Sequence, residues 1–343
     1  MSEQTVRNME EFATVSGISR PTLSKYFNDP DSVRPTTRAR IEAALEEHDY
    51  RPNIYAINQN RRLTKTIGIV VPYLSDPFFA EIARNIENLC IDAGFRPILL
   101  SSHGDQGQEN DNLDSVRGLK PAGVLLAPLG RGSDRAVIER FCDAVPTVLF
   151  DSNIDDVGEA FVGMDNAQAV GSIVQYLCNS GEPPVFFEMR DAPNPNANKR
   201  RTAYRATMER LGLEPQVISV DGDGWDFEEI GCRQGKRVIA RREMRTNTVL
   251  CSNDRLAIGF LAAAYQSGLR VGRGDSFALR VAGLDDHPFS RFTCPTLTTV
   301  SQDYAAIAER SVQELMSLIE SPDARDARHT TLFDGKLILR DSA

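Results

Sequence analysis

The chain has 343 residues, of which 41% are hydrophobic and 25% charged, so it is long enough for more than one hydrophobic core. Its apolar runs are shorter than the roughly 20 residues that cross a bilayer, and its first residues lack the basic-then-apolar pattern of an export signal, so we expect a cytoplasmic protein with no membrane partner. Six scattered cysteines without a Cys-x-x-Cys pair indicate buried thiols in a reducing compartment and argue against structural zinc.

The net charge of −9 is unevenly distributed along the chain. Residues 1–66 hold 10 Lys and Arg against 9 Asp and Glu, and residues 51–65 hold four basic residues and no acidic one. Because exposed charges are screened beyond roughly 8–10 Å at physiological salt, a local basic segment matters more than the total charge. This distribution favours a protein that contacts DNA at one end, although a solvated hinge or linker has the same composition.

The first predicted elements are three short helices. Apolar residues at helical spacing predict a helix over about residues 7–15, and Gly17 permits the tight turn that follows. Ser19 can cap a second helix, which Asn28-Asp29-Pro30 ends, and a third helix is expected to begin at Pro35. A helix, a tight turn and a short capped helix are typical of a helix-turn-helix, whose second helix enters the major groove. A mini-domain or a dimerisation module is the alternative.

The second predicted helix carries side chains that can hydrogen-bond base edges and phosphates. These side chains are Arg20, Thr22, Ser24, Lys25 and Tyr26.

Five segments near the N-terminus carry a known pattern. They are Gly17-Ile18-Ser19, Thr22-Leu23-Ser24-Lys25, Asn28, Thr37-Arg38-Ala39-Arg40-Ile41 and Tyr50-Arg51-Pro52-Asn53. With these motifs the chain resembles the LacI/GalR family of bacterial transcription regulators, and the resemblance continues through the whole chain. It implies an N-terminal all-α helix-turn-helix headpiece followed by an α/β periplasmic-binding-protein-like domain of two parallel-sheet lobes.

The resemblance also implies which headpiece residues contact DNA. Base-selecting positions correspond to Arg20, Pro21 and Lys25, and Lys25 replaces the usual arginine, which binds guanine with a more rigid fork. Residues expected at or beside the phosphate backbone are Ser19, Thr22, Ser24 and Asn28.

Residues 51–65 are expected to form a hinge. In the family this segment is loose in the free protein and helical in the minor groove, where a leucine enters between base pairs and kinks the duplex. The wedge position here is Gln59, whereas Tyr55 and Ala56 match the packing and groove-facing positions. Either Gln59 hydrogen-bonds base edges with a smaller kink, or Ile57 supplies the apolar contact.

From Thr66 onward, short apolar strands alternate with amphipathic helices, which indicates parallel sheets covered on both faces. The number of strands exceeds one domain, so we expect two lobes, and the resemblance implies three crossings between them, near Asp165, Arg291 and Asp323. The expected divisions are a helix-turn-helix domain at 1–50, a hinge at 51–65 and an effector-binding domain at 66–343, with lobe 1 at about 66–165 and 292–323 and lobe 2 at about 166–291 and 324–343.

Several polar and aromatic side chains follow the predicted strands, at the sheet edge where open α/β folds bind ligands. Aromatic rings can stack on a sugar while carboxylates and an arginine bind its hydroxyls. Each residue also has a structural explanation as a core aromatic, a helix cap or a surface ion pair. The expected effector-binding residues are Phe78, Phe79, Asp151, Arg190, Asn196, Arg200, Asn253, Asp254 and Trp225, with Phe227 as the alternative to Trp225.

Motifs for metal binding and catalysis are incomplete. Asp221-Gly222-Asp223-Gly224 resembles the opening of a calcium loop, but Trp225 stands in place of the third ligand. The four histidines are dispersed, without a His-Glu-x-x-His motif or an adjacent nucleophile. We therefore expect no metal, no cofactor and no enzymatic activity.

Together these features predict a homodimeric regulator, most simply a repressor, that binds a pseudo-palindromic double-stranded operator under the control of a small carbohydrate-like effector. The alternatives are a cytosolic sugar-binding protein and a sugar-modifying enzyme with an accessory helical domain.

Overall fold

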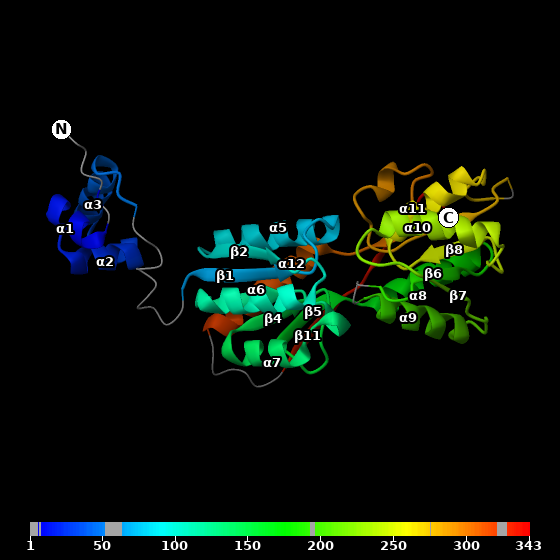
Figure 1. The fold of residues 1–343 in the computed structure, drawn as a ribbon, viewed down its shortest axis with the longest axis horizontal. Helices are drawn as coiled ribbons and strands as arrows, with labels where there is room; N and C mark the ends of the chain where they lie inside the picture. Colours follow the sequence, from blue (N-terminus) through cyan, green and yellow to red (C-terminus); the bar gives the residue numbers. More distant parts are fainter. Residues whose placement is uncertain (1–5, 7, 52–63, 193–195, 275, 321–327) are drawn as a thin grey trace. The chain divides into compact units, whose positions relative to one another are not determined.

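The computed structural model describes residues 6, 8–51, 64–192, 196–274, 276–320 and 328–343. The chain divides into two compact units, Met1–Thr64 and Lys65–Ala343, each with its own hydrophobic core (Figure 1). Among the described residues, none of the helices is both long and apolar enough to cross a membrane.

Unit 1 is a bundle of three helices. They are α1 (Met9–Ser16), α2 (Arg20–Asn28) and α3 (Pro35–Glu47), with a short 3₁₀ turn at Pro30–Ser32. Gly17 ends α1 with a φ of 61°, a left-handed conformation that glycine adopts without strain. The core between the helices holds Phe12, Leu23 and Ile41, all fully buried, and Tyr50 stacks on Phe12 with ring centroids 4.5 Å apart. These contacts fix the angle between α1 and α2.

The expectation that the Ser19 hydroxyl caps α2 is wrong. Ser19 is the residue that precedes the helix, but its side chain makes no capping hydrogen bond to the backbone. Its hydroxyl lies 2.8 Å from the hydroxyl of Thr22. This contact satisfies both side chains and leaves the first N–H groups of α2 without a Ser19 cap.

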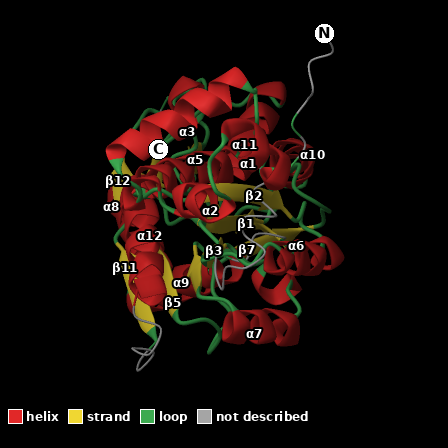
Figure 2. Cartoon of the chain, turned by 90° about the vertical axis from the view of Figure 1, so that its left-hand side faces the viewer, coloured by secondary structure: helices red, strands yellow, loops and turns green. Residues whose placement is uncertain are grey.

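Lobe 1 of unit 2 contains a six-stranded parallel sheet in the order β11-β5-β4-β3-β1-β2. Its strands are β1 (Thr66–Val71), β2 (Arg96–Ser101), β3 (Gly123–Leu126), β4 (Thr147–Phe150), β5 (Ala160–Met164) and β11 (His329–Phe333). Alternate residues of the central strands point to opposite faces, so Ile69 and Val70 belong to two different cores. The covering helices are α5 (Pro77–Asp92), α6 (Gln106–Gly118), α7 (Arg135–Ala144) and α12 (Tyr304–Glu320), and Figure 2 shows α12 beside β5.

Lobe 2 contains a four-stranded parallel sheet in the order β7-β6-β8-β9 and a two-stranded antiparallel pair, β10 with β12. Its strands are β6 (Val185–Met189), β7 (Val217–Val220), β8 (Thr248–Cys251), β9 (Arg280–Ala282), β10 (Thr299–Ser301) and β12 (Lys336–Ile338). Its helices are α8 (Asn166–Ser180), α9 (Ala197–Arg210), α10 (Phe227–Ala240) and α11 (Asp254–Gln266). The predicted architecture, a helix-turn-helix unit and two parallel-sheet lobes, is confirmed.

The chain passes between the lobes three times, and two of the passages differ from the predicted positions. The first is at Asp165, between β5 and α8. The second lies between β10 and α12 rather than near Arg291, because Thr298 bridges to Ala282 of the lobe 2 sheet. The third follows β11 rather than Asp323, which is outside the described residues, because β11 pairs with β5 of lobe 1. Residues 292–301 therefore belong to lobe 2, and His329–Phe333 belongs to lobe 1.

Candidate functional site

The outward face of α2 is the first candidate site. Leu23 is fully buried in the core of unit 1, so the helix turns Arg20, Pro21 and Lys25 to the exposed side. The Arg20 side chain is 65% exposed and contacts only Glu10 among the described residues, with Nη1 3.2 Å from Oε1. An exposed pair of this kind contributes little to stability, so the guanidinium is available to another partner.

The remaining predicted DNA contacts lie on both sides of this face. Thr22 and Ser24 are half-buried, and Ser19 is exposed. Asn28 is the last residue of α2, and its side chain is outside the described part of the structure. The hinge predictions, Tyr55, Ala56 and Gln59, also lie outside the described residues.

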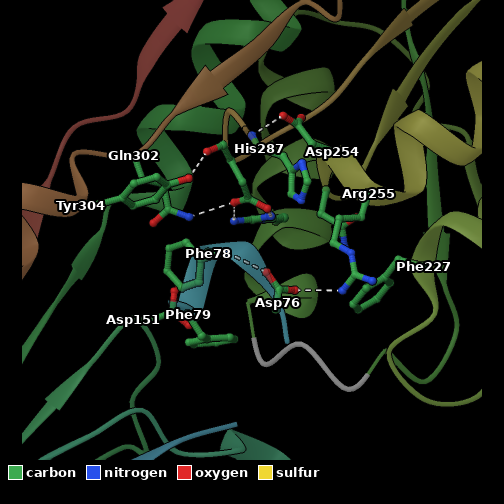
Figure 3. A pocket seen from close by; sticks show the side chains of 13 residues that line it. Asp76, Phe78, Phe79, Asp151, Phe227, Asp254, Arg255, His287, Gln302 and Tyr304 are labelled. Carbon is green, nitrogen blue, oxygen red and sulfur yellow. Dashed lines mark hydrogen bonds and ion pairs between the residues drawn. The ribbon is translucent and has the colours of Figure 1, made fainter. Parts of the chain in front are cut away.

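The second candidate site is a cavity of about 30 Å³ between the two lobes of unit 2 (Figure 3). Six of the nine predicted effector-binding residues line it, at the carboxyl ends of parallel strands. They are Phe78, Phe79, Asp151, Arg200, Asn253 and Asp254. Phe227, the predicted alternative to Trp225, lines it as well. Residues that the sequence prediction did not select also line it, namely Asp76, Arg255, Asp285, His287, Gln302 and Tyr304. A cavity of this size holds about one water, so a sugar enters only if lining side chains move.

Arg200 forms a buried ion pair at the lobe 2 side of the cavity. Its side chain is 1% exposed, and both of its terminal nitrogens contact the carboxylate of Asp285, with Nη1 3.1 Å from Oδ2. Nη1 also donates to the backbone oxygen of Ser252 at 2.8 Å, and Nε donates to Asn166 at 3.1 Å. The Nε2 of Gln302 donates to the same Asp285 carboxylate at 2.8 Å. This network fixes Arg200 of α9 relative to the start of α8 and to the segments that follow β8, β9 and β10.

Asp254 lines the cavity, but its oxygens are bound by its own lobe. Oδ1 accepts a hydrogen bond from Thr299 at 2.7 Å, and Oδ2 accepts from the Ser290 hydroxyl at 2.6 Å and the His287 N–H at 2.9 Å. Burial, together with the nearby Asp285 carboxylate, raises its pKa to about 7 against the opposing effect of these hydrogen bonds. Asn253 likewise acts locally, because its Oδ1 caps α11 by accepting from the Leu256 N–H. Both side chains stabilise the loop that forms one side of the cavity.

Asp151 is the carboxylate with free capacity for a ligand. Its side chain is buried, and Oδ1 accepts from Nδ2 of Asn196 at 3.0 Å, while no described residue donates to Oδ2. Asn196 also donates to the Asp151 backbone oxygen at 3.2 Å, so it lies behind Asp151 rather than on the cavity. Burial raises the pKa of Asp151 to about 7, although the positive charge of Arg200 opposes the shift.

Replacing Asp151 with asparagine is expected to raise the free energy of unfolding relative to the wild type, and this gain should grow as the pH rises. Because the folded-state pKa is about 7 and the unfolded one about 3.9, the folded wild type holds more protons than the unfolded chain between these values, and it loses stability as the pH rises from about 4 to about 7. An amide does not titrate and still offers an oxygen to Asn196. The free energy of unfolding of Asp151→Asn, relative to the wild type, should therefore increase by about 2–3 kcal/mol between pH 5 and pH 8.

Urea unfolding of both proteins across this pH range measures the difference directly. Asp143→Asn, at an exposed carboxylate on α7, is the matched control and should give a flat difference. A flat difference for Asp151→Asn as well would contradict the assignment of a buried, titrating carboxylate.

Arg255 connects the two lobes. Its Nη1 donates to Oδ2 of Asp76 in lobe 1 at 3.0 Å. In lobe 2, its Nε donates to Oε1 of Glu228 and its Nη2 donates to Oε2, each at 2.7 Å. The guanidinium also lies over the ring of Phe227, 5.2 Å from its centre. Asp76 caps α5 with its other oxygen, which accepts from the Phe78 N–H at 3.0 Å. Asp76 and Arg255 both line the cavity, so this ion pair joins its two sides.

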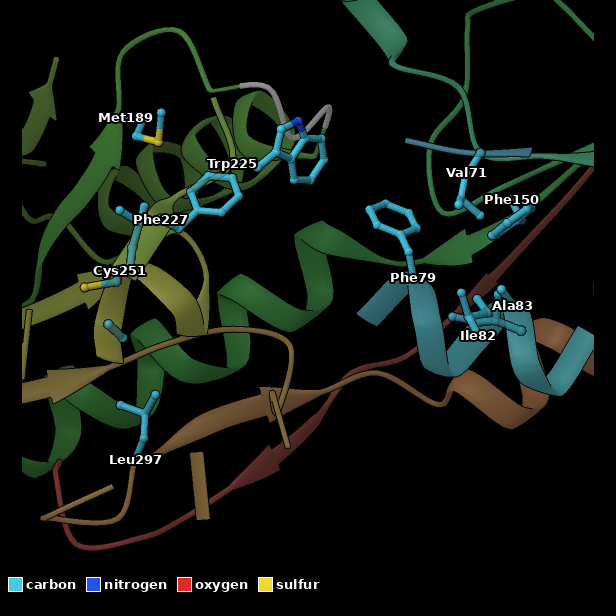
Figure 4. Packing of buried hydrophobic residues seen from close by; sticks show 14 of the residues in the cluster. Val71, Phe79, Ile82, Ala83, Phe150, Met189, Trp225, Phe227, Cys251 and Leu297 are labelled. Atoms are coloured by element: carbon cyan, nitrogen blue, oxygen red, sulfur yellow. The ribbon is translucent and has the colours of Figure 1, made fainter. Parts of the chain in front are cut away.

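Trp225 and Arg190, both predicted to bind the effector, lie outside the cavity lining. Trp225 is 6% exposed and stacks on Tyr73 of lobe 1, with ring centroids 5.1 Å apart and planes 9° apart. Figure 4 shows it between Phe227 and Phe79. Of the two alternatives, Phe227 lines the cavity and Trp225 does not. Arg190 is exposed and pairs with Asp221 at 3.2 Å. The Trp225 stack is therefore a contact between the lobes.

Trp225 is the only tryptophan, so its fluorescence reports on this contact. We expect blue-shifted emission and weak quenching by acrylamide in the wild type, because the indole is buried between aromatic rings. Tyr73→Ala removes the stacking partner and should shift the emission to the red and increase the quenching constant. Tyr265→Ala, at an exposed tyrosine on α11, should change neither. Equal quenching of all three proteins would show that the lobes do not make this contact in solution.

The described residues contain no group of three or more His, Cys, Asp or Glu side chains arranged to hold a metal ion.

Comparisons with known proteins give a consistent result for both units. Residues 8–53 match the family model of bacterial regulatory proteins, lacI family, and residues 174–343 match a periplasmic binding protein-like domain. The chain is similar to the ribose operon repressor of Escherichia coli K12, with 29% identity over 93% of this chain and 95% of that protein. It is also similar to the transcriptional repressor CytR of the same strain, with 28% identity over 99% of this chain and 97% of that protein.

The fold also matches solved structures. The crystal structure of the Lac repressor dimer bound to operator and the anti-inducer ONPF covers 98% of each chain with a TM-score of 0.82. At 22% sequence identity this match establishes the fold alone.

Proposed function

Because the chain belongs to the lacI family of bacterial regulatory proteins, we propose that it is a sequence-specific DNA-binding transcriptional repressor under the control of a small carbohydrate-like effector. The observation that carries this proposal is the exposed face of α2, where Arg20 and Lys25 project from a helix whose opposite side is locked into the core by Leu23. Such a helix, directly after a helix and a tight turn, presents its side chains to a major groove.

The proposed assembly on DNA is a homodimer. Two copies related by a two-fold axis match a pseudo-palindromic operator, whose half-sites lie about one helical turn apart. The relatives of this chain are repressors, and the similar Lac repressor structure is a dimer on operator DNA, which supports this arrangement. We place the protein in the cytoplasm, where bacterial DNA is found.

The proposed effector site is the cavity between the lobes. Phe78, Phe79 and Phe227 offer aromatic faces for the C–H surfaces of a sugar, and Asp151 offers an acceptor for its hydroxyls. Because Arg255 and Asp76 line this cavity and belong to different lobes, a ligand bound beside them changes the surroundings of a contact that joins the two lobes. Lobe orientation then couples effector binding to operator affinity, and this coupling acts equally in both directions.

Selection from a pool of random duplexes tests the DNA-binding half of this proposal. The full chain is incubated with the pool, and bound duplexes are amplified and selected again over several rounds. We expect a pseudo-palindromic sequence to be enriched. A pool that stays random after repeated rounds, with and without a sugar panel present, would contradict the proposal and favour a sugar-binding protein.

A further inference from the structure

Both guanidinium groups at the cavity are already neutralised by carboxylates of the protein. Arg200 directs its two terminal nitrogens at Asp285. Arg255 directs Nε and Nη2 at the two oxygens of Glu228, and its remaining nitrogen contacts Asp76. The pair of nitrogens on each guanidinium that could bind a phosphate or carboxylate group in a bidentate manner is therefore already bound to a carboxylate of the protein.

The remaining charge of the site is negative. The cavity lining holds the carboxyl groups of Asp76, Asp151, Asp254 and Asp285, and Glu228 stands behind Arg255. Asp151 and Asp254, with a pKa of about 7, are partly ionised at neutral pH and add to the charges of the other three. Against these stand the two arginines, since burial lowers the pKa of His287 and favours its neutral form. An entering anion would have to displace an internal carboxylate and would then lie beside it. A ligand hydroxyl, in contrast, can donate to the open Oδ2 of Asp151 without displacing any charge.

From this arrangement we infer that the cavity selects an uncharged polyhydroxyl effector and excludes phosphorylated or carboxylated molecules. Glu228 acts as a positioning residue for this selectivity: it does not line the cavity, but it holds Arg255 so that the guanidinium is unavailable to an anion. This inference rests on the proposed function, because it concerns the same effector site.

Inorganic phosphate is a sufficient probe, because the inference concerns anions in general. Thermal unfolding of the full chain is followed with increasing phosphate at constant ionic strength. We expect the Tm of the wild type and the Tm of Arg255→Gln to depend on the phosphate concentration in the same way. The double variant Glu228→Gln with Asp76→Asn keeps the size of both side chains and one acceptor oxygen on each, but removes both charges. It should gain a saturable, phosphate-dependent increase in Tm, and adding Arg255→Gln should abolish that increase.

Two further variants make the result specific to the cavity. Glu214→Gln with Asp221→Asn removes two carboxylates that pair with arginines at exposed positions of lobe 2, so it reproduces the change in net charge and should gain nothing. Glu228→Gln alone, which keeps the Asp76 cap of α5, should show a smaller gain and serves if the double variant does not fold.

Two results would overturn the inference. One is a saturable phosphate effect in the wild type that Arg255→Gln removes. The other is no gain in the Glu228 variants beyond that of the surface control. Neither measurement contains DNA, so a failure here is separate from a failure of operator binding, which the duplex selection detects.

Discussion

The double variant Arg20→Ala, Lys25→Ala is expected to lose about 2–4 kcal/mol of binding free energy for the selected duplex, or about 30- to 1000-fold in affinity. A good side-chain contact with a base edge contributes about 1–3 kcal/mol, and both side chains lie on the exposed face of α2. Lysine is expected at the lower end of this range, since it lacks the planar fork of arginine.

The same substitutions should leave the fold intact. Arg20 makes only an exposed ion pair with Glu10 among the described residues, and substitutions at such surface positions change stability by less than about 0.5 kcal/mol. Circular dichroism and urea unfolding check this, so that a loss of binding cannot be assigned to unfolding.

The matched control removes the same charge elsewhere. Arg241 and Arg245 carry exposed side chains in unit 2, and changing both to alanine should leave the affinity for the selected duplex unchanged. The ratio of affinities for selected and random duplexes is the decisive readout, measured by fluorescence anisotropy at one fixed salt concentration. If the Arg20 and Lys25 variant weakens both duplexes equally, these side chains contact phosphates and do not select bases.

Arg200→Ala is expected to destabilise unit 2 by about 3–5 kcal/mol. The substitution leaves the Asp285 carboxylate in a mostly buried position without its arginine, and it removes the donors to Ser252 and Asn166. An unpaired buried charge costs far more than the pair itself contributes, so the loss exceeds that of an ordinary arginine. Urea unfolding of the full chain, followed by the fluorescence of Trp225, measures the change in unit 2.

A second arginine on the same helix provides the control. Arg205 is exposed on α9, and Arg205→Ala should change the free energy of unfolding by less than about 0.5 kcal/mol. The variant Arg200→Ala, Asp285→Ala removes both charges and should recover part of the loss. If Arg200→Ala is as stable as Arg205→Ala, the pair is not a buried ion pair in solution.

Much of the fold was predictable because its elements carry strong local signals. Continuous apolar runs mark β1 to β9, and the turn at Gly17 separates α1 from α2. The short strands β10, β11 and β12 lack such runs, and their partners lie far away in the sequence. The second and third lobe crossings depend on these pairings, so they were misplaced.

The cavity was predictable where its residues directly follow a strong strand. Asp151 and Asp254 come after β4 and β8, and parallel strands bring such positions to one edge. Asp285 also follows a strand, β9, and could have been predicted for the same reason. Arg255 could not, because a helix residue beside Asp254 is equally typical of a solvated surface, and its contact with Asp76 joins residues far apart in the sequence.

The central claim, that this chain reads DNA under the control of a ligand, is tested most directly by operator affinity as a function of effector concentration. Thermal-shift screening first identifies a sugar that raises the Tm, and anisotropy then measures binding of the selected and scrambled duplexes with and without it. We predict at least about a 1000-fold preference for the selected duplex and a change in that affinity when the sugar saturates its site. Equal affinity for both duplexes in every condition would contradict it.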